Sequence, residues 1–304
     1  MRLRRFSAPL FLAVLTLLAA SYCAVSAQQL PAALSTDPPV DKEYPAKMDS
    51  FQIPSHGAAL NAIAYLAAGA GPHPVVIVLH GFPGNEKNLD LAQAIRRAGW
   101  NAVFFDYRGS WGSPGAFTFG NSLEDTAAAI AYLRDPANAA RLRTDSKRLV
   151  LVGHSMGGFM AAYAGAHDHG ILGIGMISAA DMAGMADRSL AGKDEKAAVQ
   201  QLGAALERED ILPLAGCTGE SLAKELIAHR NQWAFMNYAN LFGDRPLLVI
   251  TSDDGLAPSV DALASEVRKQ GSMHVTGQHF ATDHSYSDHR IALEAAVLNW
   301  LGTL

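Results

Sequence analysis

Cysteine is almost absent from this chain, which has two, Cys23 and Cys217, in 304 residues. Cys23 falls in an N-terminal segment that we expect to be removed, so one cysteine is left and an intrachain disulfide is excluded. A catalytic thiol at Cys217 is the alternative, but its sequence neighbours do not resemble an activated thiolate site. Hydrophobic residues make up 49% of the chain, which provides ample material for a core.

Positive charge is also scarce. Lys and Arg number 24 against 29 Asp and Glu, which gives a formal net charge of −5. An acidic chain has no electrostatic footprint for nucleic acid or for anionic membranes, and both are excluded as partners on that ground. The sequence also lacks internal repeats and low-complexity tracts. The composition is that of an ordinary globular protein, and the chain is long enough for one large α/β domain or two small ones.

The N-terminal residues form a segment of their own. Three arginines within residues 1–5 precede an apolar run over residues 9–25, and small residues follow up to Ala27. This order is typical of a secretory signal peptide, so we expect cleavage after Ala27 and a secreted or periplasmic protein. An uncleaved anchor is the alternative, but the run is short for a membrane-spanning helix. Cleavage removes three arginines and no acids, and the net charge then moves from −5 to −8.

The rest of the chain divides into an extended leader, residues 28–48, and an α/β domain, residues 49–304. The leader contains several prolines and shows no periodicity. Residues 51–54 and 61–66 alternate around Ser55-His-Gly57, which predicts a β-hairpin. Apolar runs then predict strands at 75–79, 102–105, 149–152, 171–177, 247–251 and 273–275. Amphipathic stretches predict helices at 88–98, 122–133, 159–166, 258–271 and 287–301, the second of them opened by a capping box of Ser122 and Asp125.

Strands that alternate with helices in this way predict an α/β fold with a mostly parallel central sheet flanked by helices on both faces. One segment, residues 181–244, breaks the alternation because it contains no convincing strand and is far longer than an ordinary connection. Val199, Leu202 and Leu206 recur at helical spacing within it. We interpret this segment as a small helical cap inserted over the carboxyl edge of the sheet.

The strand 149–152 runs directly into Gly153-His-Ser-Met-Gly157 and then into the helix 159–166. A serine on so tight a turn takes a strained backbone conformation, and the flanking glycines remove Cβ atoms that would clash. The hydroxyl is then exposed at a helix N-terminus, where backbone amides favour negative charge. Because strand and helix supply the context that this motif requires, Ser155 is predicted to be a nucleophile rather than part of a packing turn.

A serine nucleophile needs a base, and the base needs an acid to orient it. In open α/β sheets these partners follow the carboxyl ends of later strands. Asp254 follows the strand 247–251, and His284 lies in a polar loop before the final helix, so the chain order is serine, acid, histidine. The competing residues are Asp253 and Asp181 for the acid and His279 and His289 for the base.

Cleavage of an acyl group by serine also needs two backbone N–H donors for the oxyanion. Met156, directly after the serine, supplies one of them. The loop after the strand 75–79 reads His80-Gly-Phe-Pro-Gly84, which makes the amide of Phe82 the natural second donor. His80 itself is interpreted as a structural residue of that loop.

Other residues that could bind a metal or a substrate have simpler interpretations. His167-Asp-His169 resembles a metal-binding pair, but histidines after a helix more often cap its last carbonyls, so no metal site is predicted. Four aromatic residues either line a substrate pocket or pack in the core, and the sequence leaves both uses open; they are Trp111, Trp233, Phe235 and Tyr238.

Taken together, these motifs resemble the α/β-hydrolase superfamily over about residues 50–304, apart from the cap. The resemblance rests on five features, which are His80-Gly-Phe82, Asp106-Tyr-Arg-Gly109, Ser155 within Gly-His-Ser-Met-Gly-Gly, Asp254 and His284. Within the superfamily the chain is similar to secreted carboxylesterases of the dienelactone-hydrolase and prolyl-oligopeptidase-like branches, which implies serine, aspartate and histidine chemistry without a cofactor. Two departures stand out. The loop from Asp106 has an extra residue and is assigned no role, and no Gly-Gly-Gly run precedes the oxyanion donor.

The sequence therefore predicts a secreted serine hydrolase that cleaves small-molecule carboxylic esters of small or medium acyl groups through an acyl-enzyme. A serine peptidase or amidase and an acyltransferase are the alternatives on the same fold. A binding protein on a hydrolase scaffold is the non-enzyme alternative, and an intact set of three catalytic residues argues against it. The sequence indicates neither the physiological substrate nor the oligomeric state.

Overall fold

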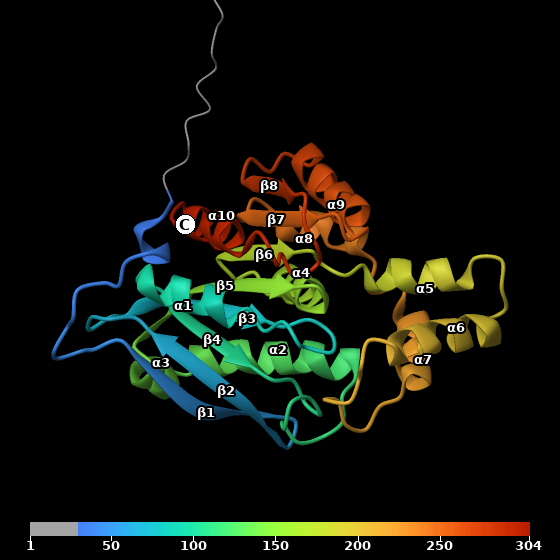
Figure 1. Ribbon diagram of the computed structural model, residues 1–304, viewed down its shortest axis with the longest axis horizontal. Helices are drawn as coiled ribbons and strands as arrows, with labels where there is room; N and C mark the ends of the chain where they lie inside the picture. Colours follow the sequence, from blue (N-terminus) through green and yellow to red (C-terminus); the bar gives the residue numbers. More distant parts are fainter. Residues whose placement is uncertain (1–29) are drawn as a thin grey trace, which may run out of the picture. The chain divides into compact units, whose positions relative to one another are not determined.

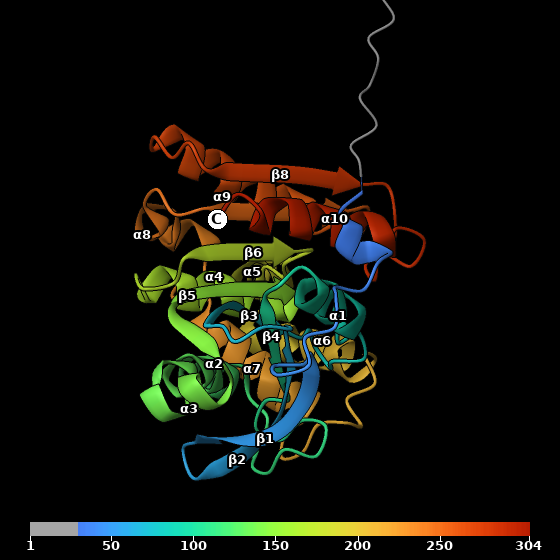
Figure 2. The ribbon, with the colours of Figure 1, turned by 90° about the vertical axis from the view of Figure 1, so that its left-hand side faces the viewer.

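Eight strands form one sheet in the computed structural model, which describes residues 30–304. Their order is β1-β2-β4-β3-β5-β6-β7-β8, which Figure 2 shows from β8 at the top to β1 and β2 at the bottom. β1 pairs antiparallel with β2 and β2 antiparallel with β4, and all other neighbours are parallel. The strands are β1 (Lys47–Ser55), β2 (Ala58–Leu66), β3 (His73–Leu79), β4 (Asn101–Phe105), β5 (Thr144–His154), β6 (Gly173–Ile177), β7 (Leu247–Ser252) and β8 (Val275–Phe280). The predicted signal peptide and its cleavage site lie outside the described residues.

Helices cover both faces of the sheet, because its parallel strands are apolar on both sides. One core forms between the sheet and α1 (Leu89–Arg97) and α10 (Arg290–Leu301). A larger core forms on the opposite face, under α2 (Phe119–Arg134), α4 (Met156–His167) and α9 (Ala257–Lys269). The short helix α3 (Pro136–Arg141) follows α2 directly and contacts β5. The predicted α/β class and the mostly parallel sheet are confirmed.

The predicted hairpin is confirmed as β1 and β2, joined by two residues. His56 and Gly57 both have positive φ, 46° and 83°, as a two-residue turn between twisted strands requires. The last strand was predicted at 273–275 and that range is wrong. β8 runs over Val275–Phe280, and most of its side chains are exposed because it forms the edge of the sheet. An edge strand of polar residues gives no apolar run for the sequence to reveal.

The predicted start of α2 at a capping box of Ser122 and Asp125 is also wrong. Thr118 is the N-cap, and its side chain accepts a hydrogen bond from the Asn121 amide at 2.9 Å. Ser122 and Asp125 are buried inside the helix. The first amides of α2 are bound from a distant segment, because the Glu225 carboxylate accepts from the amides of residues 119 and 120 at 2.9 and 2.8 Å.

Helices are the only regular structure between residues 181 and 244 of the described chain. They are α5 (Met182–Leu190), α6 (Glu195–Glu207), α7 (Gly219–His229), the 3₁₀ turn η2 (Phe235–Asn237) and α8 (Ala239–Phe242). Figure 1 shows α5, α6 and α7 together at one end of the sheet. Backbone hydrogen bonds fasten the linker between α6 and α7 to the loop after β4. The Ala215 amide donates to the Gly109 carbonyl, and the Ala215 carbonyl accepts from the Phe117 amide. The carboxylate of Glu225 on α7 adds the contact to α2 described above.

The loop after β4, to which the sequence assigned no role, ties the outer strands to α2. Arg108 Nε donates to the Asp125 carboxylate at 2.6 Å, and the Arg108 amide donates to it at 2.8 Å. Ser55, at the end of β1, donates to the same carboxylate at 2.6 Å. The Asp125 side chain is fully buried, and these hydrogen bonds offset the free-energy cost of burying its carboxylate.

None of the helices in the described part of the chain has the length and apolar character needed to cross a membrane.

Candidate active site

The turn from β5 into α4 brings two backbone segments unusually close together. Ser155, the N-cap of α4, has φ 57° and ψ −122°, which is a strained conformation for a residue with a side chain. A Cβ on Gly153 would come within 1.9 Å of the Gly157 carbonyl oxygen. A Cβ on Gly157 would come within 2.0 Å of the Leu79 carbonyl oxygen on β3. Glycine is therefore required on both sides of Ser155, as the sequence predicted from the motif.

Asp254 and His284 meet where β7 and β8 end. The Nδ1–H of His284 donates to Asp254 Oδ2 at 2.7 Å. The Asp254 side chain is 5% exposed and also accepts from the Leu256 amide at 2.9 Å, whereas the His284 side chain is 40% exposed. Both residues line the pocket that Ser155 lines, so the structure brings together the three residues predicted to act as nucleophile, acid and base.

The competing acids and bases are engaged elsewhere. Asp253 pairs with His279 at 3.1 Å, and both side chains are about half exposed. Asp181 is the N-cap of α5 and accepts from the Gly184 amide at 2.9 Å. His289 lies just before α10 and bonds Asp288 at 2.9 Å. Asp254 is the carboxylate paired with His284.

The environment of Asp254 favours its charged form. Burial alone would raise the pKa of this carboxyl. The hydrogen bond from His284, a backbone amide and two neighbouring hydroxyls outweigh burial and hold the pKa well below its usual range. The hydroxyls belong to Ser178 and Ser252, which lie 3.0 Å apart, and Ser178 also contacts the Tyr286 hydroxyl at 2.9 Å. Sequence reasoning missed this network, although Ser178 directly follows β6 and Ser252 is the last residue of β7.

His154 is a second residue that the sequence did not assign. Its Nε2–H donates to the backbone carbonyl of His284 at 2.8 Å, and the two rings lie 4.6 Å apart. Burial, together with the proximity of the His284 ring, lowers the pKa of His154 to about 3. A neutral His154 thus fixes the loop that carries His284 to the residue before Ser155.

The two amides predicted to hold an oxyanion belong to Phe82 and Met156. Neither donates to another backbone carbonyl in the described part of the chain. The Nδ1–H of His80 donates to the Gly81 carbonyl at 2.8 Å, and Trp111 Nε1–H donates to the Pro83 carbonyl at 2.8 Å. His80 is fully buried, and burial lowers its pKa to about 3. These contacts hold the loop of Phe82 beside Ser155, which agrees with the structural role predicted for His80.

Two cavities border Ser155. The first, which we call the apolar pocket, has a volume of about 400 Å³. It is lined mainly by apolar side chains from the β3 loop, α2 and the cap, including Phe82, Phe119, Met182, Met185, Ala205 and Leu206. The second, the polar pocket, has a volume of about 180 Å³ and is lined by residues 81–86 and by Ser285. Both cavities share Phe82, Ser155, Glu209 and His284.

The cap aromatics pack in the core, one of the two uses that the sequence left open. Trp233, Phe235 and Tyr238 are at most 3% exposed. Their rings lie 5.8 to 6.4 Å from the ring of Phe159 on α4. None of them lines the apolar pocket or the polar pocket. These rings attach the end of the cap to the sheet, while α5 and α6 form the pocket wall.

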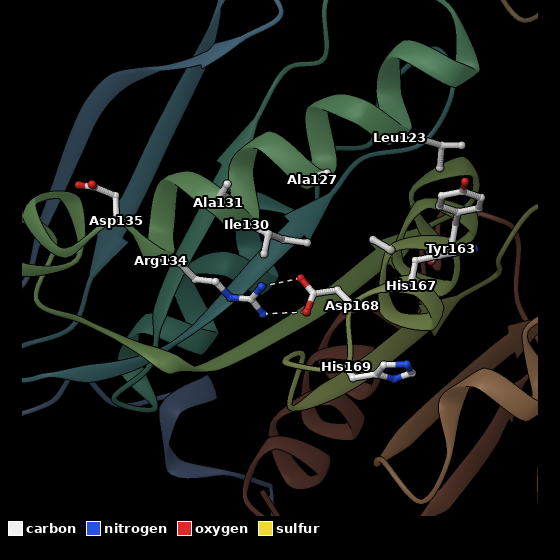
Figure 3. Close-up of a pocket in the computed structure, with 11 residues that line it drawn as sticks. Leu123, Ala127, Ile130, Ala131, Arg134, Asp135, Tyr163, His167, Asp168 and His169 are labelled. Atoms are coloured by element: carbon white, nitrogen blue, oxygen red, sulfur yellow. Dashed lines mark hydrogen bonds and ion pairs between the residues drawn. The ribbon is translucent and has the colours of Figure 1, made fainter.

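A larger hollow, about 770 Å³, lies between α2 and α4 and does not include Ser155 (Figure 3). Arg134 and Asp168 point toward one another across it and pair at 2.6 and 3.0 Å. His167 donates to the Tyr163 carbonyl in the last turn of α4, the capping role expected for it. No group of three or more potential ligands gathers to hold a metal ion within residues 30–304. Arg134 and Asp168 thus already satisfy one another, and the Asp135 carboxylate caps α3.

Comparison with known proteins places this geometry in a family. A family model described as alpha/beta hydrolase fold matches residues 74–296. No curated protein matches the chain. Among solved structures, a thermostable carboxyl esterase from Bacillus coagulans aligns with a TM-score of 0.64 at 16% identity, over 84% of this chain and 98% of that one. Est1E from Butyrivibrio proteoclasticus aligns with a TM-score of 0.63 at 19% identity, over 83% and 98%.

An esterase from Pyrobaculum calidifontis gives a TM-score of 0.61 at 17% identity, over 86% of this chain and 88% of that one. At such identities the structural likeness concerns the fold. The family match is independent of it and covers most of the chain, from β3 to within α10. The chain therefore belongs to the α/β hydrolase fold family.

Proposed function

We propose that this protein is an exported serine hydrolase that cleaves carboxylic esters of small or medium acyl groups. The proposal is carried by one observation: Ser155, the Asp254–His284 pair and Phe82 border a single pocket, and Met156 directly follows Ser155 at the start of α4. Export is proposed from the N-terminal sequence pattern alone. Exported protein that retained residues 1–27 would contradict that part of the proposal.

The chemistry follows from the roles that these groups are able to fill. His284 takes the proton of Ser155, whose oxygen attacks the ester carbonyl, and later gives a proton to the leaving alcohol. The amides of Phe82 and Met156 bind the oxyanion of the tetrahedral intermediate. Water, activated in turn by His284, then cleaves the acyl-enzyme. The described structure has no hydrogen bond from Ser155 to His284, a contact that commonly forms on substrate binding.

Asp254 keeps His284 in the required tautomer. Its carboxylate accepts from Nδ1–H, which leaves Nε2 free to act as the base. Because the hydrogen bonds around Asp254 hold its pKa low, it stays charged and stabilises the imidazolium that forms during turnover.

Three observations favour esters over peptides. Two of the structural neighbours described above are esterases by name. The apolar pocket, about 400 Å³, has the size and lining of a site for a short acyl chain. Residues 31–304 form one compact unit, and no second domain in that range is available to grip a peptide.

The first prediction concerns the reaction and its nucleophile. The purified chain should hydrolyse p-nitrophenyl esters of short and medium acids much faster than aminoacyl-p-nitroanilides. Ser155→Ala should lower kcat by about 10⁶-fold, because removal of a triad nucleophile commonly costs that much. Turnover is followed by p-nitrophenolate release, with circular dichroism to check folding. A folded Ser155→Ala variant with normal turnover, or faster cleavage of the anilides, contradicts the proposal.

The second prediction separates the three candidate acids. Asp254→Asn should lower kcat by about 10⁴-fold, because an amide favours the wrong tautomer of the histidine. Asp253→Asn and Asp181→Asn are matched controls, since Asp253 pairs with His279 and Asp181 caps α5. Both should retain kcat within a few-fold of the parent. A mild effect at Asp254 together with a severe one at Asp253 would reassign the acid.

The third prediction concerns the wall of the apolar pocket. Ala205 on α6 lines the pocket, whereas the neighbouring Ala204 is exposed and does not. Ala205→Phe should lower kcat/KM for octanoyl esters at least about tenfold and barely change acetate hydrolysis, because each methylene buried contributes about 0.8 kcal/mol. Ala204→Phe should leave both substrates unaffected. Equal losses on acetate and octanoate would mean that the acyl chain does not bind along α6.

A further inference from the structure

The polar pocket is the cavity beside Ser155 in which the leaving alcohol would lie. The apolar pocket, a separate cavity that also borders Ser155, fits an acyl chain, and a bound ester has two arms that diverge from its carbonyl carbon. With the acyl arm in the apolar pocket, the alcohol arm enters the polar pocket. Both pockets are bordered by Ser155 and His284, so the arms meet at the nucleophile and the base.

The polar pocket is lined by two carboxylates and by no Lys or Arg. The carboxylates belong to Glu86 and Glu209. The one histidine besides His284 that lines it is His154, which is buried and neutral. An anionic alcohol group would meet repulsion here, whereas a cationic one would find two negative charges.

The two carboxylates differ in how they are engaged. Glu86 accepts from the Asn88 amide at 2.6 Å and lies 3.9 Å from Arg290. Arg290 is itself paired with Asp90 at 2.6 Å. Glu209 follows α6 on the cap, is exposed, and forms neither an ion pair nor a side-chain hydrogen bond with another described residue. Glu209 also borders both pockets, which puts its charge at the mouth of the site.

We propose that Glu209 is a specificity-determining residue that selects esters of positively charged alcohols, such as choline or other amino alcohols. This inference rests on the proposed esterase function and names the alcohol class of its substrate. The free carboxylate attracts the cation as the ester enters, and Glu86, which lies 3.9 Å from Arg290, is a second carboxylate in the lining of the polar pocket. Apart from Glu209 and the three catalytic residues, the apolar pocket is lined by apolar side chains and so holds the acyl arm by apolar contact.

The experiment compares two esters of equal shape and the same acyl group. Butyrylcholine carries a quaternary ammonium, and 3,3-dimethylbutyl butyrate carries a carbon in its place. The parent protein should prefer the choline ester, and 0.5 M NaCl should weaken that preference by screening. Glu209→Gln should lower kcat/KM for butyrylcholine about fivefold, the effect of one charge pair about 4 Å apart in water-like surroundings. The neutral ester should change less than twofold.

Asp210→Asn is the matched control, because Asp210 is adjacent and exposed but lines neither pocket. It should leave the ratio of the two esters unchanged. Equal turnover of both esters by the parent, or an equal effect of Glu209→Gln on both, overturns the assignment while p-nitrophenyl butyrate hydrolysis keeps the esterase proposal intact. Failure to hydrolyse any ester, p-nitrophenyl butyrate included, overturns the proposed function and this inference with it.

Discussion

The close approach of β3, β5 and α4 at the turn around Ser155 is the constraint on which the site depends. Any side chain at Gly153 or Gly157 would overlap a backbone carbonyl, so the turn closes only with glycine at both positions. The closed turn holds Ser155 in a strained conformation at the first turn of α4. The strain is borne by the two hydrophobic cores on either side of the sheet, which fix β5 and α4 in place. The stability of the central sheet thus holds the Ser155 hydroxyl in its strained position.

The remaining parts of the site are held to this turn by buried polar contacts. His154, inside the motif, fixes the loop of His284 through a backbone carbonyl. His80 and Trp111 fix the loop of Phe82 in the same way. Glu225 fastens the cap to the N-terminus of α2. Its carboxylate accepts from the free amides there, and its negative charge interacts favourably with the positive end of the helix dipole. Apart from the contact between His80 and the neighbouring Gly81, each contact joins segments far apart in the sequence, so the pocket forms only when the whole fold is complete.

Local patterns were sufficient for the features that are determined locally. The hairpin, the central strands and the Gly-x-Ser-x-Gly turn depend on neighbouring residues, and the sequence predicted them. The predicted start of α2 was wrong because Thr118 caps the helix locally and Glu225 binds its first amides from a distant segment. The predicted extent of β8 was wrong because the strand lies at the exposed edge of the sheet. Likewise, the sequence could not decide whether Trp233 packs in the core or lines the pocket, because its contact with the Phe159 ring exists only in the folded chain. Nothing local marked Glu209 or the hydroxyls around Asp254, since their environment exists only in the folded chain.

The central claim is that Ser155 becomes covalently acylated during turnover. The most direct measurement is to react the protein with a fluorophosphonate and locate the added mass by peptide mass spectrometry. The account predicts one phosphonylated residue, Ser155, in the peptide that joins β5 to α4, with loss of all esterase activity at one equivalent of label. A label on any other residue, or full activity after complete labelling of Ser155, would contradict it.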